Sequence, residues 1–257
     1  MGKIISIANQ KGGVGKTTTA VNLSACLAAA GKKTLLIDLD PQGNSTSGLG
    51  VEKKKDQISS YDVIIARSAA GEAILPTMME NLKLMPSSIN LAGAEIELVS
   101  MMARETMLKR ALSDIREQFD YILIDCPPSL GLLTINALTT SDRVLVPIQC
   151  EFYALEGLSQ LTQTVSLVRQ SLNPNLKVEG VVLTMFDART NLSSQVATEV
   201  RRYFSDKVYE TMIPRNVRLS EAPSYGLPVI LYDPACSGAE AYRKLAREFM
   251  NGKGGQA

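Results

Sequence analysis

Two lysines stand five residues apart in a glycine-rich stretch near the N-terminus, NQKGGVGKTTTA (residues 9–20). The second, Lys16, is followed by Thr17, and this pair matches the end of the phosphate-loop pattern G-x-x-x-x-G-K-[ST]. Gln10 stands where that pattern has its first glycine. Because backbone N–H groups of such a loop and of a helix N-terminus attract anions, the stretch predicts a site for nucleotide phosphates.

The loop lies between an apolar run and a helical pattern, which is the context that a phosphate loop requires. We expect Lys16 to reach the β- and γ-phosphates and the Thr17 hydroxyl to bind Mg²⁺. The nucleotide-binding residues expected from this stretch are Lys11, Gly12, Gly13, Val14, Gly15, Lys16, Thr17 and Thr18. Lys11 has no counterpart in the common phosphate-loop pattern. Because Lys16 already serves the phosphates, we expect Lys11 to project outward, either to another molecule or into solvent.

Three aspartates follow apolar runs, Asp38 and Asp40 in LLIDLDPQGN and Asp125 in YILIDCPP. Strand alternation places Asp38 and Asp40 on the same side, at the carboxyl edge where ligands bind in parallel sheets. We expect Asp125 to hold Mg²⁺, with Thr17 and Asp38 beside the metal. The chain has no histidine, so a carboxylate is the natural group to orient an attacking water. Caps at the strand ends are the alternative role.

Strand and helix patterns alternate along the chain. The expected strands are 3–9, 33–40, 120–128, 142–149 and 177–186. This order predicts an α/β fold, a single doubly wound domain with a mostly parallel β-sheet flanked by helices on both faces. We expect one P-loop ATPase domain over 1–257, with 50–100 as an insertion within it.

The composition limits the function. The 257 residues carry a net charge of +1, so any nucleic-acid contact must be a local patch. Four cysteines without a C-x-x-C spacing indicate reduced thiols in a cytoplasmic protein. Zinc sites built on histidine are excluded, and no apolar run approaches the roughly 20 residues of a membrane span.

The loop K-G-G-V-G-K-T resembles the signature of the deviant Walker A ATPases, the group that contains ParA, MinD and the nitrogenase iron protein. The resemblance implies that Lys11 reaches across a nucleotide-sandwich dimer to the partner's phosphates. It implies catalytic roles for Lys11, Lys16 and Asp40, with Asp40 aligning the water. It also places Gly12 and Glu151 at the dimer interface.

Almost the whole chain resembles the ParA/Soj chromosome-partition ATPases, through PQGN (41–44), DCPPSLGLLTINALTTSD (125–142), LTMFDARTNLSSQV (183–196) and IPRNVRLSEAPSYGLP (213–228). The loop starts at residue 9, so no N-terminal helix-turn-helix domain is expected. The resemblance implies ATP and Mg²⁺ as cofactors, a homodimer on ATP binding, non-specific double-stranded DNA and a ParB-type protein as partners, and a cytoplasmic, nucleoid-associated location.

The same resemblance assigns two further sites. Arg189 and Arg218 match the arginines that contact DNA in Soj-type proteins, with a solvated surface charge as the alternative for each. Pro214 and Asn216 resemble the adenine-binding loop, and Met185 and Phe186 are expected to wall that pocket unless they pack in the core.

Other functions remain open at this point. A MinD-like regulator of cell division would carry a C-terminal amphipathic helix that binds a membrane. The residues NGKGGQA after Met250 have no apolar face. An ATP-tuned DNA-binding transcriptional regulator would bind ATP without turnover. A metabolic P-loop enzyme of the dethiobiotin-synthetase kind would need an acceptor pocket. The iron protein expects cysteines that bridge a cluster, and buried packing explains Cys126 and Cys150 better.

Overall fold

A seven-stranded sheet forms the centre of the computed structural model, which describes residues 2–54, 56–151 and 156–252. Its strand order is β3-β4-β2-β5-β1-β6-β7. The strands are β1 Lys3–Ile7, β2 Thr34–Asp38, β3 Leu75–Pro76, β4 Leu82–Met85, β5 Tyr121–Asp125, β6 Arg143–Gln149 and β7 Lys177–Thr184. All neighbours pair in parallel except β3 with β4, so the expected mostly parallel sheet is confirmed.

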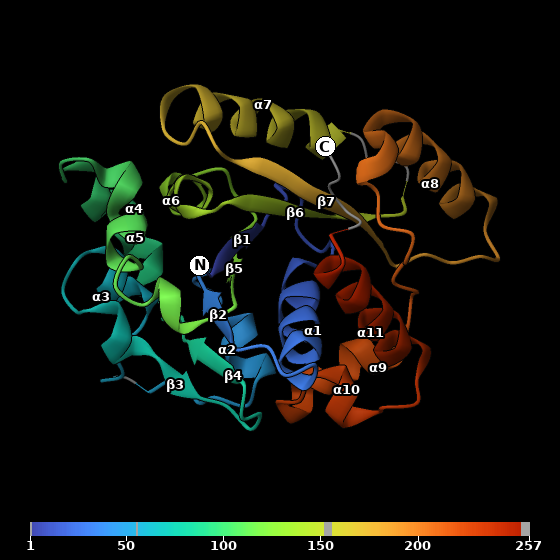
Figure 1. Cartoon of the computed structure of the whole chain (residues 1–257), viewed down its shortest axis with the longest axis horizontal. Coiled ribbons are helices and arrows are strands. Elements are labelled where there is room, and N and C mark those ends of the chain that lie inside the picture. The colour runs from blue at the N-terminus through green and yellow to red at the C-terminus, as the bar shows by residue number, and fades with distance from the viewer. Residues whose placement is uncertain (1, 55, 152–155, 253–257) are drawn as a thin grey trace.

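Helices cover both faces of the sheet (Figure 1). The helices are α1 Lys16–Ala29, α2 Asn44–Gly48, α3 Ser60–Ile64, α4 Leu91–Val99, α5 Met107–Ala111, α6 Leu132–Thr140, α7 Glu156–Ser171, α8 Asn191–Phe204, α9 Val217–Glu221, α10 Val229–Tyr232 and α11 Ser237–Met250. Helices α1 and α11 pack against one face, where Leu23, Leu27, Tyr242 and Leu245 are buried with strand residues. Helices α3 to α8 supply the other face.

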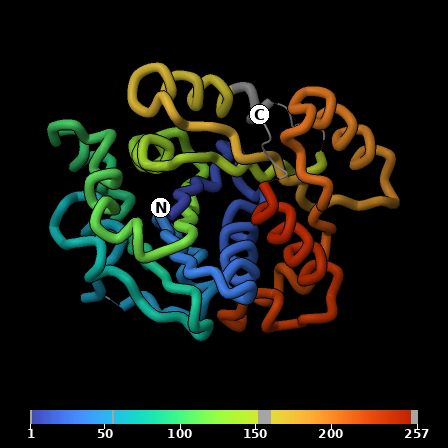
Figure 2. Tube along the Cα trace, in the orientation of Figure 1, coloured from blue at the N-terminus to red at the C-terminus, as the bar shows by residue number. Residues whose placement is uncertain are grey.

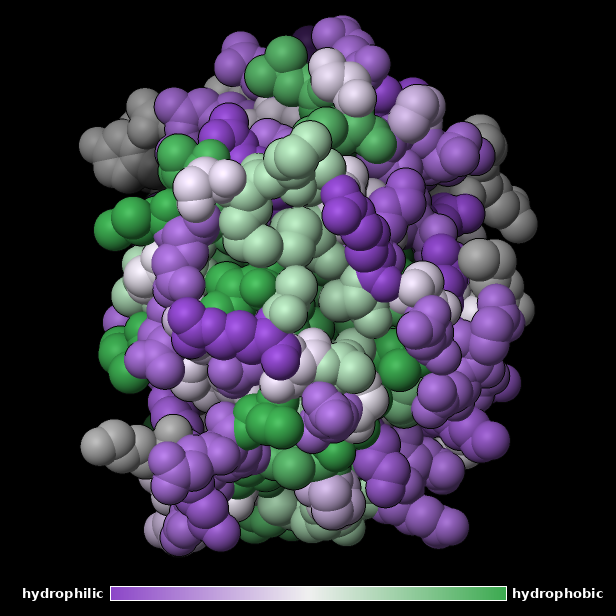
Figure 3. Space-filling view, turned by 90° about the vertical axis from the view of Figure 1, so that its left-hand side faces the viewer, coloured by the Kyte–Doolittle hydropathy of each residue, from purple (hydrophilic) through white to green (hydrophobic). Residues whose placement is uncertain are grey.

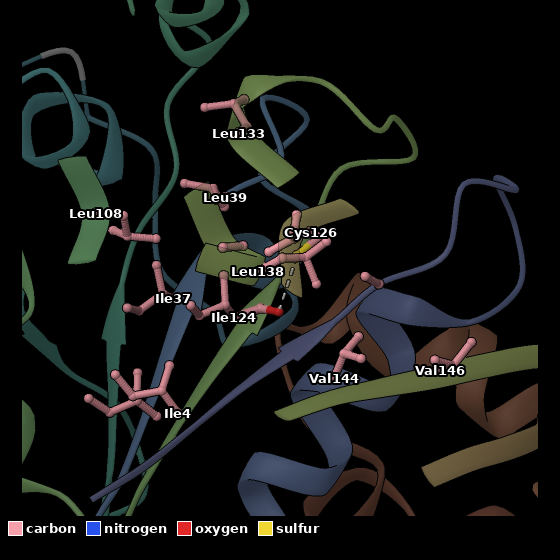
Figure 4. Close-up of a cluster of buried hydrophobic side chains, with 14 of the residues drawn as sticks. Ile4, Ile37, Leu39, Leu108, Ile124, Cys126, Leu133, Leu138, Val144 and Val146 are labelled. Atoms are coloured by element: carbon pink, nitrogen blue, oxygen red, sulfur yellow. Dashed lines mark hydrogen bonds between the residues drawn. The ribbon is translucent and has the colours of Figure 1, made fainter. Parts of the chain in front are cut away.

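The second apolar layer lies between the sheet and helices α3 to α8, and Figure 4 shows part of it. Ile4, Ile37 and Ile124 come from neighbouring strands, and Leu133 and Leu138 come from α6. Alternate residues of each buried strand therefore serve the two layers, which explains why the strands read as continuous apolar runs. Burial of these side chains is the main force that holds the sheet between its helices.

The segment 50–100, expected as an insertion within the domain, contributes to the central sheet. It supplies β3 and β4, and β4 pairs in parallel with β2 from Thr34 opposite Leu82 to Ile37 opposite Met85. The segment thus contributes two strands to the framework of the domain. The sequence did not indicate this role, because the polar residues 52–59 lie between β4 and its partner strand β2.

The side of the molecule that carries α3, α4 and α5 is turned to the viewer in Figure 3. Apolar groups interrupt the polar surface there. Large exposed apolar side chains belong to α4 and its flanks: Ile89, Ile96, Val99 and Met102. On the inner side of the same helix, Glu95 Oε1 accepts a hydrogen bond of 3.3 Å from the backbone N–H of Leu133 in α6.

At Gly226 the C-terminal part of the chain packs closely against Gly50, in the loop after α2. It has a φ of 65°, and a Cβ there would lie 2.6 Å from the Cα of Gly50. Gly31, the residue after the C-cap of α1, also has a positive φ, 79°, but a Cβ there meets no heavy atom within 4 Å. The two glycines therefore share backbone strain and differ in the steric clash.

We predict that Gly226→Ala lowers the free energy of unfolding by roughly 2–4 kcal/mol, whereas Gly31→Ala lowers it by about 1 kcal/mol. The first change adds a backbone clash to the left-handed strain that both changes share. Urea unfolding followed by circular dichroism measures the difference. Equal losses for the two variants would contradict the close approach of Gly226 to Gly50.

Candidate active site

The C-terminal ends of three strands meet at one edge of the sheet. Asp38 and Asp125 end β2 and β5 and are direct partners in the register of the two strands. On the other side of β5, Asp125 pairs with Ile7, the last residue of β1, and the loop 8–15 follows immediately. The structure therefore brings the phosphate loop and both aspartates together, as the sequence predicts.

Hydrogen bonds attach the loop 8–15 to strands β6 and β7. Asn9 Nδ2 donates to the carbonyl of Pro147 in β6 (2.8 Å), and Asn9 Oδ1 accepts from the backbone N–H of Lys11 (3.0 Å). Thr184 Oγ1, at the end of β7, donates to the carbonyl of Val14 (2.8 Å). These bonds fix the loop on two strands and leave its exposed part, Gly12 and Gly13, free of neighbours.

Lys16 is directed back over the loop. Its side chain is buried, and Nζ donates to the carbonyl of Lys11 (3.0 Å). Burial lowers the pKa of Lys16, and the nearby charges of Asp125 and Asp40 oppose that shift. A buried cation with acidic neighbours on one side and a glycine-rich loop on the other is placed to receive an anion.

Lys11 behaves differently. Its side chain is partly exposed, and no described residue forms a hydrogen bond or ion pair with its Nζ. Next to it, Gly12 is exposed, and a Cβ there would meet no heavy atom within 4 Å. The chain therefore has room for a side chain at residue 12. It provides no described partner for the ammonium group of Lys11.

Asp38 and Asp125 form a buried pair of like charges. Asp38 Oδ2 accepts hydrogen bonds from the backbone N–H (2.8 Å) and hydroxyl (2.7 Å) of Thr46, and Asp125 Oδ2 accepts one from the Ser45 hydroxyl (2.8 Å). Burial raises the pKa of both carboxyls. The charge of Asp38 raises the pKa of Asp125 further, and the charge of Asp40 raises that of Asp38. Asp125 Oδ1 is buried without a hydrogen-bond partner.

These features fit a divalent cation. An unpartnered buried carboxylate oxygen and a repelling pair of acids both favour an added positive charge. The Thr17 hydroxyl, in the first turn of α1, is the third expected ligand. Within the described ranges, no group of three or more cysteine and acidic side chains could hold a metal ion alone. The set therefore suits Mg²⁺, which completes its ligands with water and phosphate.

Asp40 lies two residues beyond the end of β2 and is almost buried. Its Oδ1 accepts from the backbone N–H of Gln42 (2.9 Å), and its carbonyl accepts from the Ser87 hydroxyl (2.5 Å). The turn at PQG and the residues after β4 thus hold Asp40 in place. The charge of Asp40 acts to raise the pKa of Lys16, against the larger effect of burial.

A cavity of about 230 Å³ opens beside the loop. Its lining residues are Gly15, Thr18, Thr184, Met185, Ile213, Pro214, Arg215, Asn216, Leu219, Ser220, Pro223 and Tyr242. The predicted Met185, Pro214 and Asn216 are among them, whereas Phe186 packs against the hydrophobic core instead. Asn216 caps α9 by accepting from the N–H of Arg218 (2.8 Å), so its side chain is held at the rim.

The remaining predicted residues lie outside this cavity. Glu151 follows β6 and accepts from Arg215 Nη2 (3.3 Å). Arg189 lies between β7 and α8, and Arg218 lies in α9; both are substantially exposed, at 88% and 47% of their side chains. Cys126 and Cys150 are buried in the core, in agreement with a packing role.

Several functional residues were missed by the sequence reasoning. Ser45 and Thr46 hold the two buried aspartates, and Asn9 and Thr184 anchor the loop. The signal was present in the hydroxyl-rich NSTS that follows PQG, and in the polar residues that end the strand regions. Their partners are 80 or more residues away in some cases, which the pattern of the sequence does not reveal.

The fold and the site together define a nucleotide-binding P-loop protein. The model of the AAA domain family matches residues 2–178. The sporulation initiation inhibitor protein Soj of Bacillus subtilis is 63% identical over 96% of this chain and 98% of its own length. The chromosome partitioning protein ParA of Myxococcus xanthus is 55% identical over 97% of this chain and 88% of its own.

A solved structure also resembles this chain. Cobyrinic acid a,c-diamide synthase from Mycobacterium smegmatis, with bound ATP analog and magnesium, has a TM-score of 0.86 and 39% identity, and the match covers 98% of this chain and 95% of the other. The chain belongs to the ParA/Soj family of chromosome-partition ATPases. The expected resemblance and fold class are confirmed.

The buried acids give a testable consequence. We predict that Asp125→Asn raises the free energy of unfolding without ligand by about 1 kcal/mol or more, because it removes one of two repelling buried charges. The same change removes most of the thermal stabilisation that Mg²⁺ with ATP adds. Thermal unfolding with and without these ligands measures both effects.

Asp142→Asn is the matched control. Asp142 binds Arg116 through both carboxylate oxygens (2.9 and 2.7 Å), so its neutralisation should lower stability and leave the ligand effect intact. If Asp125→Asn destabilised the ligand-free protein as Asp142→Asn does, the repulsion between Asp38 and Asp125 would be refuted.

Proposed function

We propose that this protein is a switch driven by ATP. Two subunits close face to face over two ATP molecules, and the dimer binds DNA without sequence preference and acts in chromosome or plasmid partition with a ParB-type protein. The observation that carries the proposal is Lys11, whose ammonium group has no partner among the described residues of its own chain, although Lys16 serves the same loop. The identity with Soj and ParA proteins supports the partition role.

The chemistry is hydrolysis of the terminal anhydride bond of ATP. Lys16 binds the β- and γ-phosphates of its own subunit, and Lys11 neutralises charge on the transferring phosphoryl group of the partner subunit. Asp40 orients the attacking water. Thr17, Asp38 and Asp125 hold Mg²⁺, which when bound neutralises phosphate charge. Hydrolysis is slow until the ParB-type partner aligns Asp40 and the water.

The cavity beside the loop supports a placement for the nucleotide. The adenine ring lies between Met185 and Pro214, and backbone groups near Asn216 read its edge. Glu151 approaches the nucleotide of the partner subunit. Arg189 and Arg218 contact the DNA phosphates, which places the working protein in the cytoplasm on the nucleoid.

Alternative functions are less well supported. The structural relative from M. smegmatis is named for a synthase, but the Soj and ParA relatives are more similar in sequence, at 63% and 55% against 39%. A MinD-like function needs a membrane contact. No described helix is long and apolar enough to cross a bilayer, and most of the tail that bears on surface binding, 253–257, lies outside the described residues. An ATP-tuned transcriptional regulator would show no turnover with its partner protein.

The dimer is tested with Asp40→Ala, which should slow hydrolysis and trap an ATP-bound dimer. In this background we predict that Lys11→Ala and Gly12→Val each abolish the dimer. Gly12→Val has space in the monomer, so its side chain should clash only with a second subunit. Size-exclusion chromatography with light scattering at saturating ATP gives the mass.

Nucleotide binding by a fluorescent ATP analogue is the control. Lys11→Ala and Gly12→Val should retain it, whereas Lys16→Ala should lose it. An Asp40→Ala protein that binds ATP and stays monomeric would contradict the proposal, and so would a dimer that persists after Lys11→Ala.

DNA binding is tested by its dependence on salt. If four to six phosphates are neutralised per dimer, log K should fall against log salt with a slope of roughly −4 to −5. Arg189→Ala with Arg218→Ala should reduce both the affinity and the slope. A slope near zero, or a double variant that binds DNA like the wild type, would exclude these arginines as the contact.

A further inference from the structure

Arg189 is held by a carboxylate two residues before it. Arg189 Nε and Nη2 donate to Asp187 Oδ1 (2.9 Å) and Oδ2 (2.7 Å), a two-pronged ion pair. The backbone N–H of Arg189 also donates to Asp187 Oδ1 (3.0 Å), so one carboxylate fixes both the turn and the guanidinium. These bonds lower the pKa of Asp187 to about 2, so the carboxyl is charged at any physiological pH.

Arg218 is held between two carboxylates. Nη1 donates to Glu221 Oε2 (2.8 Å), and Nε lies 3.2 Å from Asp233 Oδ2. The Tyr232 hydroxyl donates to the same oxygen of Glu221 (3.2 Å), which fixes that carboxylate in turn. The arrangement joins α9 to the end of α10 through the arginine that the proposed function assigns to DNA.

The third arginine of this region, Arg215, pairs with Glu151 (3.3 Å). The loop before α8 and helix α9 both lie on the right-hand side of Figure 1. Three arginines here meet four carboxylates, so the group carries one net negative charge. These arginines are therefore already paired with carboxylates, and this group by itself does not attract a phosphodiester backbone, although it contains the right donors.

We propose that Asp187, together with Glu221 and Asp233, competes with DNA phosphate for Arg189 and Arg218 and so keeps the DNA affinity of a single subunit low. This inference rests on the proposed DNA binding and adds its regulation. DNA binds by exchange: each phosphate replaces a carboxylate at a guanidinium, and the carboxylate returns when the DNA leaves. Arginine is suited to both partners, because carboxylate and phosphate accept the same two-pronged bond.

The exchange makes binding depend on a second subunit. An exposed pair of this kind changes an equilibrium by a factor of about 1.4–5. In a dimer the factors of the two subunits multiply, so the loss of one carboxylate per subunit should tighten DNA binding by about 2–25-fold. A monomer shows only the smaller factor and starts from a much weaker affinity.

The test uses Asp187→Asn and Glu221→Gln in the full-length chain. Both changes remove a charge and nearly preserve shape, and an asparagine oxygen can still accept the N–H of residue 189. We expect each variant to bind a short labelled DNA duplex several-fold more tightly than the wild type with ATP, measured by fluorescence anisotropy. The variant with both changes should also bind DNA detectably with ADP, where the wild type does not.

Glu97→Gln is the matched control for net charge. Glu97 pairs with Arg67 on the opposite side of the molecule, next to α3 and α4, so its neutralisation adds the same charge away from the proposed contact. Adding Arg189→Ala to Asp187→Asn should abolish the gain, because the gain acts through Arg189. Thermal unfolding should shift only slightly in the two test variants, as expected for the loss of one exposed ion pair, and ATP-dependent dimerisation should stay at the wild-type value.

The outcomes separate the two proposals. If the wild type fails to bind DNA with ATP, or binds it as well after Arg189→Ala and Arg218→Ala, the DNA contact itself is wrong. If those arginines matter but Asp187→Asn and Glu221→Gln bind no more tightly than Glu97→Gln, the competition is refuted and the DNA contact stands. A gain confined to one of the two variants assigns the competition to that arginine alone and overturns it for the other.

Discussion

Two aspartates that face each other across neighbouring strands are the constraint on which the site depends. The register of β2 and β5 leaves Asp38 and Asp125 no way to move apart, and the core around them excludes water. Hydroxyls of the segment after PQG, Ser45 and Thr46, supply the hydrogen bonds that such charges require. The loop 41–46 is thereby hydrogen-bonded to the two aspartates. A change in the charge of these carboxyls therefore alters the hydrogen bonds that hold the loop.

The loop 41–46 is also hydrogen-bonded to the residues that follow β4. The backbone N–H of Ser87 donates to the Thr46 hydroxyl (3.0 Å), and the Ser87 hydroxyl bonds the carbonyl of Asp40. The residues that follow β4 therefore share hydrogen bonds with the residues that follow β2. Beyond them α4 contacts the start of α6 through Glu95. On the same side, the hydroxyl of Ser60 in α3 donates to the carbonyl of Asp38 (2.6 Å), so a polar contact also joins the end of β2 to α3.

Much of this arrangement follows from the sequence. The alternation of elements was sufficient for the fold class, which is confirmed. The glycine-rich loop between a strand and a helix and the aspartates that end apolar runs indicated a phosphate site, which stays a prediction. The membership of β4 in the central sheet was not predicted, because pairing in parallel sheets joins distant segments. The role of Ser45 was not visible for the same reason, since its partner Asp125 is 80 residues away, and no sequence pattern marked the bonds of Thr46 to the nearby Asp38. The ion pairs of Arg189 and Arg218 are short-range, yet acidic residues near arginines are common on any solvated surface and gave no signal.

The position of β1 in the middle of the sheet has a consequence for how the chain is made. Figure 2 shows the blue N-terminal segment enclosed by segments from later parts of the chain. β1 pairs with β5 and β6, so its edges remain open until residues up to 149 have left the ribosome. The loop 8–15 depends on β6 and β7 as well. Folding is therefore governed by contacts between remote segments, which form slowly, and the first functional motif to be synthesised is among the last to be assembled.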